Sequence, residues 1–102
     1  MPSDKLEEIR NKIDEIDAAI VDLLSQRMHY AKEAKEEKMR LRMPIEDRQR
    51  EKEVVEKWCK RARRSRRGRD GGAEHELSEE MMVKMAEFII EYTVKKELEE
   101  EQ

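Results

Sequence analysis

Two cations occupy positions where the helical repeat favours apolar side chains. Residues 6–43 have the periodicity of one long amphipathic helix, with Arg27 on the centre line of its apolar face and Lys38 close to that line. A cation on a core stripe costs about 1–5 kcal/mol unless an anion meets it. Two such cations, 11 residues apart, predict an acidic ligand or an internal carboxylate beside the helix. The stripe itself comprises Ile9, Ile13, Ile16, Ile20, Leu23, Leu24, Ala31 and Ala34.

Further polar residues lie on apolar faces of two later helical segments. Arg50 and Glu51 stand beside valines in the second segment, and the third places Thr93 one turn before Glu97. Arg10 lies at the edge of the first stripe, about 100° from its centre, where it can face a neighbouring chain. The set carries more positive than negative charge, and arginine binds carboxylate or phosphate groups in bidentate fashion. A pocket for a small dianion is therefore predicted.

The sequence lacks the motifs of metal binding, nucleotide binding and nucleophilic catalysis. It contains no Glu-x-x-His pair, no His/Cys cluster and no glycine-rich phosphate loop, and His29 and His75 stand in no catalytic context. We therefore expect no metal and no cofactor. The single Cys59 cannot form an internal disulfide, which suits a reducing compartment. Because no signal peptide and no membrane-spanning apolar run are present, we expect a cytoplasmic protein with no membrane partner.

The composition favours an all-α fold that positions these residues. Charged residues make up 48% and aromatic residues 4% of the 102-residue chain, as in helical bundles and coiled coils. Capping residues and a proline set the expected helix limits: from 3 or 4 to about 42, from 46 or 47 onward after Pro44, and from Ser78 onward. The chain is thus expected to be a single domain, 1–102, with one very long, one medium and one C-terminal helix.

The first helix is too long for the domain that it belongs to. About 38 residues span roughly 57 Å, whereas a compact domain of about 100 residues is roughly 35 Å across. Its apolar stripe cannot be covered by its own chain alone. A second copy related by a two-fold axis is the simplest cover, so we expect an intertwined helical homodimer.

A strongly basic segment separates the last two helices. Residues 60–69 contain seven lysines and arginines and no acid. We expect a flexible, solvated Arg-rich loop at about 61–77 that the core can lose without harm. A nucleic-acid patch is the alternative interpretation. No aromatic residues are interleaved for base stacking, so nucleic acid is not expected as a partner.

Several segments share the spacing of one enzyme family: residues 6–17, 23–27, 44–51 and 89–91, together with Lys38. Through them the chain resembles the all-helical class of chorismate mutases, nearly throughout except in the basic segment. The resemblance implies an intertwined homodimer with two buried sites and no cofactor. It also implies conversion of chorismate to prephenate in phenylalanine and tyrosine biosynthesis. That reaction is a Claisen rearrangement with no covalent intermediate.

The resemblance implies catalytic roles for Arg27 and Lys38 of the first expected helix and for Glu97 of the third. The positions of Arg27 and of Arg10 from the partner chain bind the substrate carboxylates in the family, and the Lys38 position bonds the ether oxygen. The Glu97 position often carries Gln, whose amide donates a second hydrogen bond to that oxygen. A carboxylate only accepts. Glu97 must therefore be protonated to take this role, or the site lacks the donor.

The second and third helices supply the remaining substrate-binding positions. By the same resemblance, Asp47 and Glu51 serve the ring hydroxyl of the substrate, and Arg50 belongs to the cationic wall. Thr93 lines the carboxylate end of the pocket.

Three alternatives stay open at the level of sequence. An isochorismate-pyruvate lyase of the same fold would use a nearly identical cationic pocket. A non-enzymatic helical adaptor or nucleic-acid-binding dimer would use the Arg-rich segment. In a plain dimeric coiled coil, Arg27 and Lys38 would pair with glutamates of the other chain. Turnover of chorismate distinguishes the mutase from the adaptor and from the plain coiled coil, and an assay with isochorismate distinguishes it from the lyase.

Overall fold

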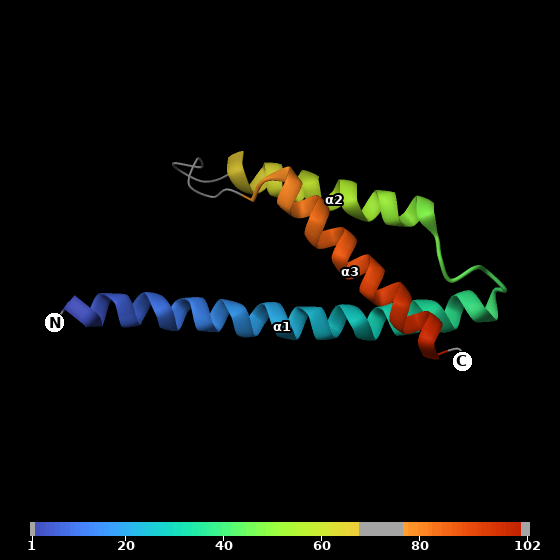
Figure 1. Cartoon of the computed structure of the whole chain (residues 1–102), viewed down its shortest axis with the longest axis horizontal. Helices are drawn as coiled ribbons and strands as arrows, with labels where there is room; N and C mark the ends of the chain where they lie inside the picture. Colours follow the sequence, from blue (N-terminus) through green and yellow to red (C-terminus); the bar gives the residue numbers. More distant parts are fainter. Residues whose placement is uncertain (1, 68–76, 101–102) are drawn as a thin grey trace. The chain divides into compact units, whose positions relative to one another are not determined.

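The protein is an all-α chain, as the composition predicts. The computed structural model describes residues 2–67 and 77–100, and within them it contains three helices and no strand: α1 (Pro2–Arg40), α2 (Arg48–Arg67) and α3 (Glu79–Glu100) (Figure 1). By its internal contacts the chain divides into two compact units, residues 1–37 and 38–102. None of the helices in the described ranges is long and apolar enough to cross a membrane.

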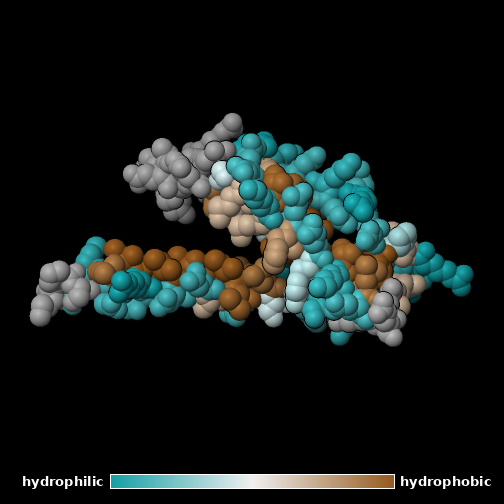
Figure 2. Space-filling view, viewed as in Figure 1, coloured by the Kyte–Doolittle hydropathy of each residue, from teal (hydrophilic) through white to brown (hydrophobic). Residues whose placement is uncertain are grey.

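The first unit is one continuous helix with an exposed apolar stripe. Side chains of the stripe remain open to solvent: Ile16 is 58% exposed, Ile13 50% and Leu24 39%. Figure 2 shows these residues as an apolar band along the N-terminal part of α1. Exposed leucine and isoleucine side chains in a continuous band are typical of a surface that another chain covers.

The end of α1 is a Schellman motif built without glycine. The Met43 amide donates to the Lys38 carbonyl at 2.8 Å, and the Arg42 amide donates to the Met39 carbonyl at 3.1 Å. Arg42 adopts a left-handed backbone with φ 57°, which costs a residue other than glycine about 1–2 kcal/mol. Pro44 follows and prevents the helix from continuing. The predicted break near residue 42 is confirmed, with α1 ending at Arg40.

Side-chain caps begin α2 and α3 where the sequence predicts them. An Asp47 carboxylate oxygen accepts from the Arg50 amide at 3.0 Å, and the Ser78 hydroxyl oxygen accepts from the Met81 amide at 3.1 Å. The two helices are closest near the end of α2 and diverge toward its start (Figure 1). Their small shared core consists of Cys59, Ala62 and Met82, with Val55, Trp58 and Val83 packed against it.

The prediction of a loop from residue 61 is wrong for residues 61–67, which continue α2. Arginine, lysine and alanine favour helix, and the first glycine of the segment is Gly68. Ala62 is 1% exposed in the core, and Arg63 Nε donates to Glu79 Oε1 at 2.6 Å. This part of the segment is therefore not dispensable. The rest of the predicted loop, residues 68–76, lies outside the described residues.

Candidate active site

Lys38 is the best-defined cation of the candidate site. It sits half-buried in the last turn of α1, and its Nζ donates to the Ile45 carbonyl at 2.8 Å. The Lys38 carbonyl accepts the Met43 amide of the Schellman motif. Both ends of this residue thus hold the connection between α1 and α2. An ammonium has three N–H donors, so two remain for a ligand.

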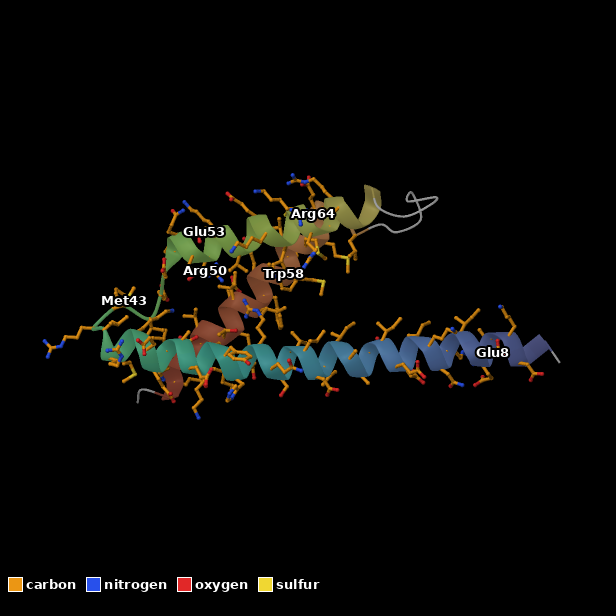
Figure 3. The ribbon with its side chains drawn as sticks, turned by 180° about the vertical axis from the view of Figure 1, so that it is seen from behind. Glu8, Met43, Arg50, Glu53, Trp58 and Arg64 are labelled. Atoms are coloured by element: carbon orange, nitrogen blue, oxygen red, sulfur yellow. The ribbon has the colours of Figure 1, made fainter. Side chains whose placement is uncertain are left out.

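The start of α2 brings three candidate residues together. Asp47 is half-buried and caps the helix through one carboxylate oxygen. Glu51, one turn later, is half-buried as well. Arg50 is exposed, and its Nη1 lies 3.8 Å from Glu53 Oε2 (Figure 3). An exposed ion pair of this kind contributes about 0–1 kcal/mol, so Arg50 can leave Glu53 for a ligand at little cost.

A groove of about 780 Å³ opens where α2 and α3 diverge. Apolar residues of both helices line it, Val55 from α2 and Ile90, Val94 and Leu98 from α3. Of the predicted site residues, only Glu51 contributes to this groove. The groove is therefore a neighbour of the predicted site rather than the site itself.

Thr93 and Glu97 are buried polar residues of α3. Their exposed fractions are 7% and 8%, and one helical turn separates them, so they share a face. The Thr93 hydroxyl donates to the Ile89 carbonyl at 2.6 Å. Donation to a substrate carboxylate therefore requires the hydroxyl to turn away from Ile89.

Two predicted site residues, Arg10 and Arg27, lie in the first unit. Arg27 is half-buried. Arg10 is exposed, and its Nη1 lies 3.2 Å from Glu7 Oε1 one turn earlier. Within the described part of the chain, Glu7 is an ion-pair partner of Arg10, and the action of Arg10 on a neighbouring chain stays a prediction.

Sequence reasoning missed Lys35, the most deeply buried cation of α1. Its side chain is 6% exposed. Between residues 4 and 40 only five side chains are not exposed: Arg27, Met28, Ala31, Lys35 and Lys38. Lys35 lies three residues before Lys38 and eight after Arg27, on the same helical face. That spacing is the signal in the sequence that could have identified it.

These features describe an all-helical protein with half-buried cations on α1 and buried polar residues on α3. The family model for chorismate mutase type II matches residues 9–98, a range that contains every candidate residue. A curated chorismate mutase of Methanocaldococcus jannaschii is 37% identical over 92 residues, which cover 87% of this chain and 80% of that relative. No solved structure gave a significant match.

The chain belongs to the chorismate mutase type II family. Its activity is accordingly that of a chorismate mutase, which is an isomerase. The family match supports this activity over the lyase and the adaptor alternatives.

Proposed function

We propose that the candidate residues form two equivalent active sites in a homodimer, where chorismate rearranges to prephenate for phenylalanine and tyrosine biosynthesis. The observation that carries the assignment of the site is Lys38, a half-buried ammonium held at 2.8 Å from a backbone carbonyl with two donors to spare. The free Cys59 thiol suits a cytoplasmic location.

The reaction sets simple demands on the protein. The ether C–O bond breaks as a new C–C bond forms within the same molecule, so no proton or electron is exchanged with the enzyme. The site must hold a flexible dianion in the reactive chair, which is an orientation problem. It must also present fixed positive charge where the ether oxygen becomes more negative.

Lys38 and Glu97 stabilise the negative charge that develops on the ether oxygen. One of the free N–H donors of Lys38 bonds the ether oxygen, and removal of such a donor from an enzyme site costs about 3–4 kcal/mol of transition-state stabilisation. Glu97 donates a second hydrogen bond to that oxygen in its protonated form. Its burial on the same face as Thr93 supports this position.

The arginines hold the substrate dianion in its reactive conformation. Arg27 binds one substrate carboxylate, and Arg10 of the partner chain binds from across the dimer interface. The exposed apolar stripe of α1 supports the dimer. The Arg10–Glu7 ion pair is 61% and 59% exposed on its two sides, so substrate displaces it at a cost of about 0–1 kcal/mol.

The start of α2 holds the ring hydroxyl of the substrate. Asp47 keeps one oxygen for its cap, while the other oxygen and Glu51 accept from the hydroxyl. Arg50 leaves Glu53 to complete the cationic wall. Thr93 closes the carboxylate end after its hydroxyl turns away from Ile89.

Mixing two inactive variants tests the shared site. Arg10→Ala and Arg27→Ala are each expected to lose turnover of chorismate alone. In an equal mixture about half of the dimers contain one chain of each kind, and each of these restores one site of two. Recovery of about a quarter of the wild-type activity is expected from this two-fold arrangement.

Two controls accompany the mixing experiment. Isochorismate, assayed in parallel, reports lyase activity by release of pyruvate, and none is expected. Subunit exchange is verified with differently tagged chains. A fully exchanged mixture without recovered mutase activity would show that Arg10 and Arg27 act within one chain.

A further inference from the structure

The last turns of α2 carry a stripe of cations without counterions. Lys57, Lys60, Arg61 and Arg64 are all exposed. Their spacing of i, i+3, i+4 and i+7 puts them on one face of the helix. We name these four residues the basic stripe. Its direction is opposite to that of Trp58, Cys59 and Ala62, which pack toward α3, and Figure 3 shows Trp58 on the α3 side of the helix.

Three nearby carboxylates of the described residues have ion-pair partners outside the stripe. Glu53 pairs with Arg50, Glu79 with Arg63, and Glu80 with Lys84. Glu56 lines the groove between α2 and α3. Within the described part of the chain, no ion pair reaches any member of the basic stripe. Glu53 and Glu56, four residues before Lys57 and Lys60, offset part of the repulsion among these four like charges, but in the described structure neither forms an ion pair with the stripe.

The helix fixes the spacing of the four cations, which a flexible loop would not do. From residue 57 to residue 64 the stripe extends about 10.5 Å along the helix axis. A single strand of duplex DNA carries one phosphate per 3.4 Å of its axis, so this length covers roughly three phosphate spacings, or about four successive phosphates. Two of the four residues are arginines, which bind phosphate in bidentate fashion.

We propose that the basic stripe is a sequence-independent binding surface for the phosphate backbone of a double-stranded nucleic acid, in addition to the mutase activity. The stripe has no aromatic member, which argues against a single strand bound by base stacking. It has no apolar member either, whereas a protein partner needs an apolar anchor. The earlier expectation that nucleic acid is not a partner assumed a loop here, and α2 replaces that loop with an ordered surface.

The salt dependence of duplex binding tests the proposal with the full chain. The probe is a labelled DNA duplex of mixed sequence, about 16 base pairs long, titrated by fluorescence anisotropy between about 50 and 200 mM salt. Four neutralised phosphates predict a slope of about −3.6 in log K against log salt. That slope corresponds to a loss of affinity of about 150-fold over this range.

A matched pair of variants separates the stripe from net charge. Lys60→Gln with Arg64→Gln removes two cations from the stripe, and the expected slope falls to about −1.8. Lys84→Gln with Lys96→Gln removes two exposed cations of α3 and is expected to leave the slope unchanged. Chorismate turnover, unchanged in both double variants, shows that the fold is intact.

Several results would overturn the proposal. They are no duplex binding at about 50 mM salt, an unchanged slope in the stripe variant, and an equal loss in the α3 variant. Binding of labelled poly-glutamate in preference to the duplex would also overturn it, because the stripe would then serve an acidic protein. The mutase assignment does not depend on any of these outcomes.

Discussion

The two units of this chain differ in whether their apolar side chains are buried or exposed. In residues 38–102, α2 and α3 bury Ala62 to 1% and Met82 to 8% exposure and cap their own first turns. In the described part of residues 1–37, no apolar side chain is buried, although the stripe there contains four isoleucines. The second unit holds its own small core, whereas the first carries an apolar surface that its own chain leaves open. The most informative tests are therefore substitutions in one unit that leave the other unit unchanged.

The largest effect is expected from a charge on the stripe of α1. In a two-fold dimer Ile13→Glu places a carboxylate in the interface twice, at roughly 3–5 kcal/mol per chain. The dissociation constant should rise at least about ten-thousandfold, and turnover should vanish with the shared sites. Ala18→Glu adds the same charge on the opposite face and should leave the dimer intact. Sedimentation equilibrium measures both; a dimeric Ile13→Glu protein would place the interface elsewhere.

Lys38 is the first residue of the second unit, and Lys38→Ala should reduce turnover by about a hundredfold or more, on the scale of losing one oxyanion donor. The variant also strands the Ile45 carbonyl, so a loss of about 1 kcal/mol in the free energy of unfolding is expected as well. Steady-state kinetics and urea unfolding separate the two effects. A variant that unfolds while the remaining folded fraction keeps full turnover would make Lys38 purely structural.

Glu97 should make turnover fall as the pH rises. The protonated carboxyl donates to the ether oxygen and the carboxylate cannot, so turnover should fall about tenfold per pH unit above the titration of Glu97 in the substrate complex. Glu97→Gln donates at every pH and should flatten that limb. Profiles from about pH 4 to 9 for both proteins decide the question. Two profiles of the same shape would mean that Glu97 is not the donor.

The core of the second unit should respond to added volume where α1 does not. Ala62→Leu overfills the contact between α2 and α3 and should lower the free energy of unfolding by about 1–3 kcal/mol. Ala18→Leu, the same change at an exposed position of α1, should stay within about 0.5 kcal/mol. Urea unfolding measures both variants. Equal effects would remove the distinction between the two units.

The smallest effect concerns the end of α1. Arg42→Gly relieves the left-handed backbone at that position, which should raise the free energy of unfolding by about 1 kcal/mol, less a fraction for the added freedom of the unfolded chain. Arg40→Gly, at the last residue of the helix, should instead lower it, by up to about 1 kcal/mol. Thermal unfolding of the two variants gives opposite shifts if the Schellman motif forms as described.

The sequence predicted the elements better than it predicted their ends. Ser78, Asp47 and Pro44 act through contacts within a few residues, so the limits that they set were predictable. The extension of α2 to Arg67 depends on Ala62 packing against α3 and on the Arg63–Glu79 ion pair, and a local pattern does not reveal such distant partners. The tie between Lys38 and the Ile45 carbonyl was likewise hidden.

Candidate site residues were predictable where polarity contradicted periodicity. Thr93 and Glu97 stood out on an apolar row, and their burial agrees with that reading. Lys35 was missed because it lies about 80° from the centre of the sequence stripe, while the residues of α1 that are not exposed shift from that stripe toward Met28 and Lys35. Only the packing of the folded chain determines which part of a wide apolar face is covered.

Lys38 ends α1 through its carbonyl and holds the following connection through its ammonium. A single residue thus ties the last turn of α1 to the connection that leads to α2. Inserting even one residue between Leu41 and Ile45 would separate the carbonyl of Ile45 from the ammonium and leave the proposed catalytic cation without its support. The length of this connection should therefore be nearly invariant among active variants, so that a library of loop insertions would find the boundary of the site without any substitution of a site residue.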